Sequence, residues 1–132
     1  LESHAPIDRV VLMLGTNDCK SLYHASAEVI GLGIEQLLKQ IRKIDSDTRI
    51  LLISPIQLGE GDWELEFDPE FNQKSVEVSK KLKSVYQRIA LKYNCDFLAA
   101  YDIAAPSSAD REHLNDEGHQ KLAEAVLKVI AA

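Results

Sequence analysis

The segment Val10–Leu14 constrains the fold more than any other, because five apolar residues follow one another without a polar break. A run of this kind is typical of a strand that is buried on both faces of a parallel sheet. The run ends at Gly15, and a Thr-Asn-Asp triplet that suits turns and helix N-caps follows it. Open parallel sheets bind ligands at the carboxyl ends of their strands. The segment therefore predicts a central strand over residues 8–14 that delivers Asn17 to a ligand site.

The rest of the chain alternates between segments with helical spacing of apolar residues and short apolar runs. Strands that alternate with single helices pair in parallel through right-handed crossovers. This order predicts an α/β protein with a doubly wound parallel sheet. Ser26 is expected to cap the first helix, and Asn94 to end the second in a left-handed conformation. The expected strands cover residues 8–14, 49–54 and 95–99, and the expected helices cover residues 27–44, 73–93 and 115–131.

Three strands are few for this architecture, and the first has the apolar character of a central strand. A central strand without a neighbour would present a bare hydrophobic edge, which natural proteins avoid. We therefore expect residues 1–132 to form the C-terminal portion of a single domain whose N-terminal strands lie outside this sequence. The alternative is that a partner chain completes the sheet.

The charge and the cysteine content of the chain indicate which partners and which cellular compartment to expect. The chain has 21 acidic and 15 basic residues, and its formal net charge of −6 disfavours non-specific binding to nucleic acid or to a membrane surface. Cys19 and Cys95 show neither a disulfide framework nor the spacing of a metal site. We expect them to be free thiols in a reducing compartment, the cytoplasm. No metal and no cofactor are expected.

Two short motifs resemble blocks of a known family. The segment Met13–Asp18 reads Met-Leu-Gly-Thr-Asn-Asp, and the segment Asp110–Asn115 reads Asp-Arg-Glu-His-Leu-Asn. In this order they resemble the Gly-x-Asn-Asp and Asp-x-x-His blocks of the SGNH/GDSL esterase superfamily. The segment Glu117–Ala123 is similar to the start of that family's final helix. The resemblance implies a flavodoxin-like three-layer sandwich and a serine hydrolase that acts on esters or thioesters through an acyl-enzyme, without a metal.

The resemblance also implies roles for three residues. Asn17 would donate a side-chain N–H to the oxyanion, and Asp110 and His113 would be the orienter and the general base. A carboxamide is a neutral, directional donor, and the pKa of imidazole lies near the working pH, so these residue types suit the chemistry. The family's nucleophile lies in a Gly-Asp-Ser block, which this sequence lacks, and it is expected upstream of Leu1. The 132 residues alone are therefore predicted to be inactive.

The substrate class follows from the same resemblance. The run Leu14–Lys20 looks closest to arylesterase-like or lysophospholipase-like members that act on short acyl esters, and a carbohydrate acetylesterase also fits. Gly15, Trp63 and Phe67 are the candidate substrate-binding residues. The loop segment over residues 59–71 follows the carboxyl end of a strand and is more apolar than a solvated loop requires. It forms either a wall of the acyl or alcohol pocket, or a small hydrophobic cluster, or a contact in a homo-oligomer.

The alternative function is a non-catalytic α/β module that binds a small anionic or sugar ligand at the same strand ends. In that case Asn17 only shapes a turn, and Asp110 and His113 belong to a solvated polar loop. Cys19, close to the site, is either a nucleophile or a packed, inert thiol. Arg111 stands where the family often has glycine, so its side chain either tunes substrate choice or points to solvent.

Overall fold

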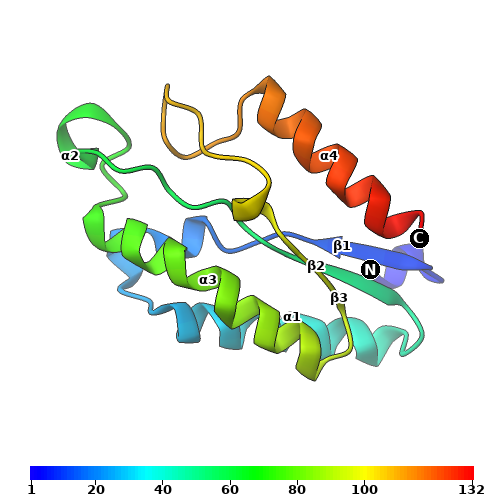
Figure 1. Ribbon diagram of the computed structural model, residues 1–132. Coiled ribbons are helices and arrows are strands. Elements are labelled where there is room, and N and C mark those ends of the chain that lie inside the picture. Colours follow the sequence, from blue (N-terminus) through cyan, green and yellow to red (C-terminus); the bar gives the residue numbers. More distant parts are fainter.

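The computed structural model describes all 132 residues and contains one parallel sheet with the strand order β1-β2-β3. β2 pairs in parallel with both neighbours, with Val10 opposite Ile50 on one side and Leu52 opposite Phe97 on the other. All three carboxyl ends therefore point in one direction, toward the loop that carries the short helix α2 in Figure 1. The strands are β1 (Arg9–Leu12), β2 (Arg49–Ser54) and β3 (Asp96–Ala99).

Helices cover both faces of this sheet. In Figure 1, α1 and α3 lie side by side beneath the sheet, and α4 lies above it. This three-layer arrangement confirms the predicted α/β fold with a parallel sheet. The helices are α1 (Ala27–Ile44), α2 (Trp63–Glu66), α3 (Gln73–Lys92) and α4 (Asp116–Ile130), and the 3₁₀ turns are η1 (Glu2–His4), η2 (Asn17–Cys19), η3 (Ser21–Tyr23) and η4 (Ala100–Asp102).

Polar residues mark the ends of the long helices, and the predicted positions of Ser26 and Asn94 are confirmed. The Ser26 hydroxyl accepts the N–H of Val29 at 3.2 Å and caps α1. At the start of α3, the side chain of Asn72 accepts the N–H of Ser75, whose hydroxyl accepts the N–H of Asn72 in return. This reciprocal pair satisfies two N–H groups that would otherwise lack a partner. Asn94 follows α3 with a φ of 52°, the predicted left-handed conformation.

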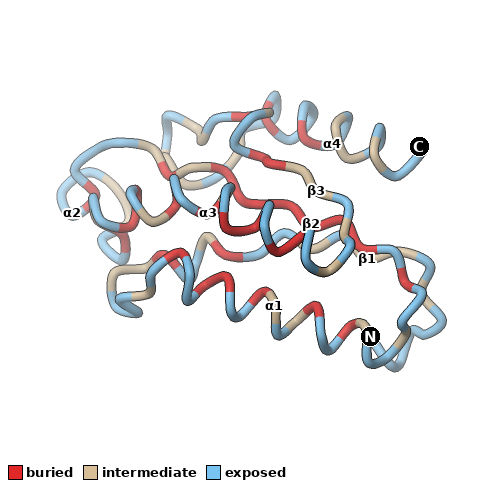
Figure 2. Tube along the Cα trace, turned by 60° about the horizontal axis from the view of Figure 1, so that its bottom comes forward, coloured by how far each residue is buried: buried red, intermediate tan, exposed pale blue.

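The core has two parts because β2 is buried on both of its faces (Figure 2). Ile50 and Leu52 belong to the larger cluster, which lies between the sheet and the helices α1 and α3. Leu51 and Ile53 belong to a smaller cluster that lies between the sheet and α4, where Leu122 packs. Alternate residues of a strand point to opposite faces, so one six-residue strand supplies both layers.

β1 differs from the prediction of a central strand buried on both faces. It covers four residues rather than seven, and it forms an edge of the sheet. Val10 and Leu12 pack against the larger core, but Val11 is 46% exposed and Met13 is 41% exposed. The apolar cluster beneath α4 is built on Leu51 and Ile53 of β2 and includes no residue of β1, and no strand pairs with the free edge of β1.

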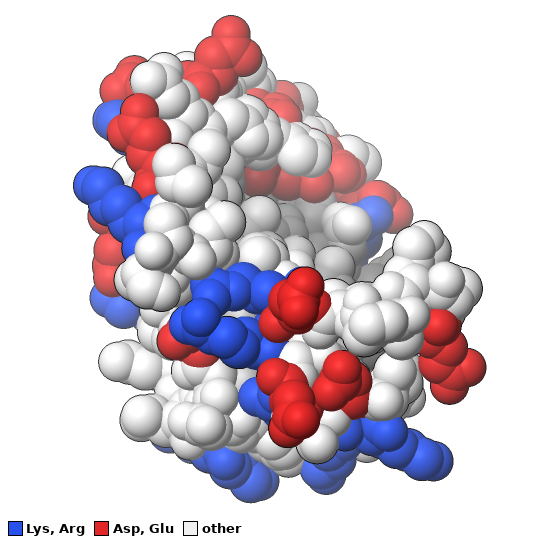
Figure 3. Space-filling model, turned by 90° about the vertical axis from the view of Figure 1, so that its right-hand side faces the viewer, with Lys and Arg blue, Asp and Glu red and all other residues white.

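The end of the sheet that carries the amino ends of the strands faces the viewer in Figure 3. Basic and acidic side chains are interspersed there, without a large patch of one sign. Arg49 and Asp96, which begin β2 and β3, form an ion pair at 3.6 Å on this end. In the whole chain, no helix is long and apolar enough to cross a membrane.

Two glycines of α1 make a matched pair for testing the packing of this helix against α3. A Cβ at Gly31 would lie 2.6 Å from Cγ1 of Val85 and 3.1 Å from Cδ1 of Ile89, whereas a Cβ at Gly33 would meet no atom within 4 Å. Gly31→Ala is expected to lower the free energy of unfolding by about 1–3 kcal/mol through overpacking. Gly33→Ala is expected to raise it by about 0.5–1 kcal/mol, because alanine loses less conformational freedom in a helix.

Urea unfolding followed by circular dichroism measures both effects on the 132-residue chain. A Gly31→Ala variant that is as stable as Gly33→Ala would show that α1 and α3 are not in close contact at this position.

Candidate active site

The loop before α4 is a closed turn that holds itself together. The N–H of Ser107 donates to the carbonyl oxygen of His113 at 2.7 Å, and the N–H of Arg111 donates to the carbonyl oxygen of Ser107 at 2.8 Å. The Ser107 hydroxyl accepts the N–H of Ala109 at 3.1 Å. These bonds fix the backbone on both sides of the motif before any ligand binds.

Asp110 and His113 form a hydrogen-bonded pair inside this loop. Oδ2 of Asp110 lies 2.8 Å from Nδ1 of the imidazole, and Oδ1 accepts the N–H groups of Glu112 and His113 at 3.0 Å each. The carboxylate thus sets both the ring orientation and the tautomer that leaves Nε2 facing away from it. No hydrogen bond engages Nε2, and the nearest carboxylate oxygen to it, Oε1 of Glu112, is 3.8 Å away.

The two side chains shift each other's titration in the direction that a general base requires. Loss of hydration would raise the pKa of Asp110, but the two N–H groups and the imidazole outweigh it and lower that pKa to about 2. The hydrogen bond to Asp110 raises the pKa of His113 above 6.5, more than loss of hydration lowers it. An imidazole that gains a proton next to a fixed carboxylate is stabilised as imidazolium. The pair can therefore accept a proton at Nε2.

The turn after β1 is shaped by a contact that the sequence analysis did not foresee. The hydroxyl of Tyr86, on the inner face of α3, donates to the carbonyl oxygen of Leu14 at 2.7 Å. Gly15 is buried beneath it with a φ of 134°, and a Cβ there would lie 2.2 Å from that hydroxyl oxygen. Gly15 is thus buried against Tyr86 at the bend after β1, and its role as a substrate-binding residue stays a prediction. A lone tyrosine on an otherwise apolar helix face was the available signal.

Asn17 begins the 3₁₀ turn η2 directly after this bend. The backbone of the turn is satisfied internally, since Asp18 donates to Gly15 and Lys20 donates to Asn17. The carboxamide of Asn17 is exposed and makes no hydrogen bond within the chain. Its N–H₂ group is therefore free to bind a ligand oxygen.

The three loops at the carboxyl ends of the strands are joined to one another. The N–H of Ser21, in the loop after β1, donates to the carbonyl oxygen of Glu70 at 2.8 Å, and Lys20 pairs with the Glu70 carboxylate at 2.5 Å. The N–H of Gly59, in the loop after β2, donates to the carbonyl oxygen of Arg111 at 2.8 Å. The loop after β2 therefore bridges the loop that carries Asn17 and the loop that carries the Asp-x-x-His motif.

The aromatic residues of this bridging loop divide into core and surface. Trp63 is 1% exposed, lies 5.5 Å from the rings of both Phe67 and Phe71, and donates from Nε1 to the carbonyl oxygen of Gly59 at 3.2 Å. Trp63 belongs to the larger core, which fits the hydrophobic-cluster alternative for this loop; its role as a substrate-binding residue stays a prediction. Phe67 is half-buried, and the guanidinium of Arg111 lies over its ring.

The chain offers no nucleophile to this imidazole. No serine hydroxyl is hydrogen-bonded to the ring of His113, and Ser54, at the end of β2, is fully buried with an unpartnered hydroxyl. Burial and, secondarily, the charge of Asp18 raise the pKa of the Cys19 thiol to about 12, so it is a packed thiol rather than a thiolate. No group of three or more His, Cys, Asp or Glu side chains is placed to hold a metal ion.

Comparisons with known proteins identify the family and the fold of the chain. The model of the GDSL-like Lipase/Acylhydrolase family matches residues 1–121. A carbohydrate acetylesterase family member from Sinorhizobium meliloti is 31% identical, with a TM-score of 0.89 over 98% of this chain and 63% of its own. An aryl esterase from M. smegmatis in an inhibitor-bound form is 23% identical and shares the fold, with a TM-score of 0.88 over 98% of this chain and 63% of its own.

A search of curated protein sequences finds no match. The chain spans about 61–63% of the length of the solved structures that lead the comparison.

Proposed function

Because this chain belongs to the GDSL-like lipase/acylhydrolase family, we propose that it supplies the base and an oxyanion donor of a serine esterase. The observation that carries the proposal is the 2.8 Å contact between Nδ1 of His113 and Oδ2 of Asp110, with Nε2 left free. In this mechanism Nε2 takes the proton of a serine hydroxyl as it attacks the ester carbonyl. It then returns the proton to the leaving alcohol, and a water repeats the sequence on the acyl-enzyme.

Asn17 is the proposed oxyanion donor. Attack on an ester carbonyl places a negative charge on its oxygen, and a fixed N–H donor stabilises that charge in the transition state. The carboxamide of Asn17 is unpaired within the chain, and the loop that bears it is joined through Glu70 to the loop after β2. The same loop is bonded to Arg111, beside the proposed base, so both groups are held at one end of the sheet.

The nucleophile is proposed to lie outside residues 1–132, on a segment that pairs with the free edge of β1. That edge is apolar, since Val11, Met13 and Leu14 are all exposed beside it. A further strand would satisfy the unpaired backbone groups of β1 and cover these side chains. The segment belongs either to the N-terminal part of the same domain or to a partner chain.

The proposed substrates are short-chain acyl esters. The likeness to a carbohydrate acetylesterase family member at 31% identity supports acetyl esters of carbohydrates, and aryl esters and lysophospholipids are the other members of the proposed class. Both cysteines are free, which supports a reducing compartment, the cytoplasm, as the proposed location.

The pH dependence of p-nitrophenyl acetate hydrolysis by the complete protein tests the proposed function. His113 acts as a base only when neutral, and its pKa lies above 6.5. Activity is therefore expected to be low below this pKa, to rise as the pH passes through it, and to level off above it. Asp110→Asn removes the first cause of the raised pKa, so it should move the rise to lower pH and reduce the plateau.

Two controls accompany this measurement. Phenylmethylsulfonyl fluoride should abolish turnover by the complete protein, and the 132-residue chain alone should show none. Turnover with no inflection between about pH 5 and pH 8, unchanged in Asp110→Asn, would contradict the assignment of the base. A complete protein that binds but never hydrolyses acyl esters would be a binding module instead.

A further inference from the structure

Arg111 occupies an unusual backbone conformation in the middle of the Asp-x-x-His motif. Its φ is 60°, in the left-handed region that residues with a Cβ seldom adopt. Asp110 precedes it, and the N–H groups of the next two residues bind the Asp110 carboxylate. The left-handed residue is thus the bend that brings these two N–H groups, and the ring of His113, back onto Asp110.

The backbone of Arg111 also ties this bend to a second loop. Its N–H donates to Ser107 within its own loop, and its carbonyl oxygen accepts the N–H of Gly59 from the loop after β2, both at 2.8 Å. The stem of the side chain lies so close to Gly59 that a Cβ on that glycine would be 2.7 Å from Cβ of Arg111. The two loops are therefore in contact through main chain and side chain at one residue.

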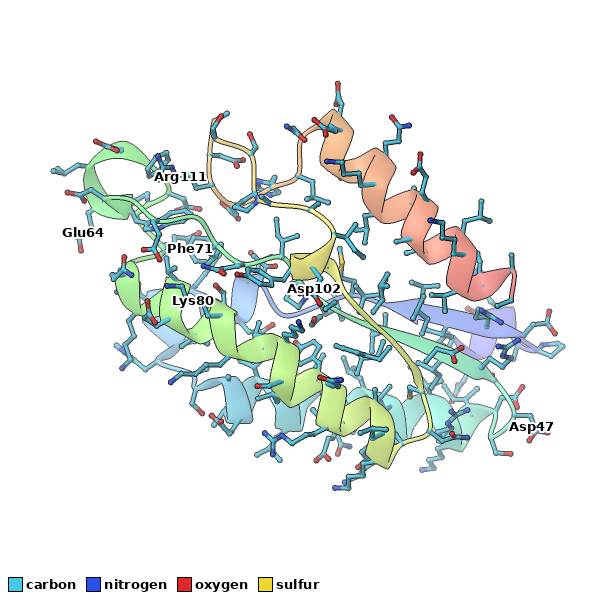
Figure 4. The ribbon with its side chains drawn as sticks, viewed as in Figure 1. Asp47, Glu64, Phe71, Lys80, Asp102 and Arg111 are labelled. Atoms are coloured by element: carbon cyan, nitrogen blue, oxygen red, sulfur yellow. The ribbon has the colours of Figure 1, made fainter.

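The guanidinium of Arg111 adds a further contact between the Asp-x-x-His loop and the loop after β2. Its central carbon lies 4.9 Å from the centroid of the Phe67 ring, and no carboxylate lies within 4.0 Å of its nitrogens. Figure 4 shows Arg111 between the loop that carries α2 and the loop that precedes α4. Phe67 packs in turn on the fully buried Trp63, with ring centroids 5.5 Å apart. A continuous series of contacts thus runs from the core to the Asp-x-x-His loop.

We propose that Arg111 is a positioning residue: stacked on Phe67, it fastens the loop of Asp110 and His113 to the loop after β2. His113 needs such support, because its side chain is 70% exposed and its one hydrogen bond is to Asp110 in the same loop. With Arg111 anchored, the bend cannot open, and the Asp110 carboxylate stays on Nδ1. The consequence for catalysis rests on the proposed function, whereas the effect on the Asp110–His113 pair does not.

NMR titration of His113 in the complete protein tests the proposal through two variants that keep every charge. Phe67→Leu removes the aromatic platform, and Arg111→Lys removes the planar stacking partner. In each variant the loosened loop should weaken the hydrogen bond between Asp110 and His113, and the pKa of His113 should therefore fall. The expected decrease is roughly 0.3–0.7 units, which corresponds to the free energy of one exposed cation–π contact.

Two matched variants serve as controls. Leu65→Ala truncates an 84% exposed side chain in α2 beside the same loop, and Arg88→Lys makes the same exchange of cations on the exposed surface of α3. Neither should move the pKa of His113. If Phe67→Leu and Arg111→Lys also leave it unchanged while the chain stays folded by circular dichroism, Arg111 does not position the pair. Should Phe67→Leu unfold the chain, Arg111→Lys decides the matter alone.

The complete protein separates this proposal from the proposed function. A positioning role predicts that Arg111→Lys lowers kcat for p-nitrophenyl acetate severalfold and leaves KM unchanged. A rise in KM alone would mean that Arg111 contacts the substrate instead, and would overturn the positioning role. A protein without esterase activity whose His113 still shifts in both variants would refute the function and keep the proposal.

Discussion

Replacing His113 by alanine in the complete protein is expected to lower kcat/KM for p-nitrophenyl acetate by about 10⁴-fold. The side chain is the only group with a free ring nitrogen next to an oriented carboxylate, and Oδ1 of Asp110 is held by two backbone N–H groups of the loop, so Asp110 is not free to take its place. The residual activity should no longer show the inflection above pH 6.5, because the titrating group is gone.

His119→Ala is the control for this substitution. His119 lies in the first turns of α4, is exposed, and takes no part in the pair. Its removal should leave kcat/KM and the pH profile unchanged. If His119→Ala and His113→Ala retain equal activity, with both proteins folded, then the imidazole of His113 is not the base.

Replacing Asn17 by alanine is expected to lower kcat by about 10²- to 10³-fold with little change in KM, the usual effect of removing one oxyanion donor. The effect falls on kcat because the hydrogen bond strengthens as charge develops on the ester oxygen. This carboxamide makes no hydrogen bond within the chain, so the free energy of unfolding should change little. Steady-state kinetics and the urea unfolding midpoint measure the two quantities separately.

Asn17→Asp distinguishes an oxyanion donor from a residue that only shapes a turn. Aspartate has the same shape and the same preference for turns and helix starts as asparagine, but it has no N–H₂ group and adds a negative charge. If Asn17 is an oxyanion donor, kcat should fall in Asn17→Asp at least as far as in Asn17→Ala. If Asn17 only shapes the turn, Asn17→Asp should keep near-normal activity.

The local elements of the fold were readable from the sequence alone. Helical spacing of apolar residues, with Ser26 as cap, predicted α1 over Ala27–Ile44, and the apolar run after Thr48 predicted β2 over Arg49–Ser54, as observed. The left-handed Asn94 was predicted as well. These features depend on periodicity and on hydrogen bonds between near neighbours in the chain, which the sequence order specifies directly.

The surroundings of each side chain were decided by contacts between distant segments. The apolar run Val10–Leu14 indicated a buried strand, but exposure depends on which strand and helix lie beside it, and β1 is an edge. The apolar residues of the loop around Trp63 left a pocket wall, a hydrophobic cluster and an oligomer contact as alternatives, and only the structure places the Trp63 ring in the larger core. Gly15 is buried because the side chain of Tyr86 covers it. Tyr86 lies 71 residues further along the chain, and the packing of α3 brings it to Gly15.

The candidate site also combines a feature of local sequence with contacts between distant segments. The resemblance of the Asp-x-x-His segment to the family's block singled out Asp110 and His113 as candidates, and in the structure a single bend brings their side chains to 2.8 Å. Only the tertiary structure decided what holds that bend: a left-handed Arg111 bonded to Gly59 and stacked on Phe67, across a sequence distance that no local pattern spans. Local spacing encodes hydrogen bonds within a turn, whereas contacts between loops arise only once parallel strands bring their carboxyl ends together.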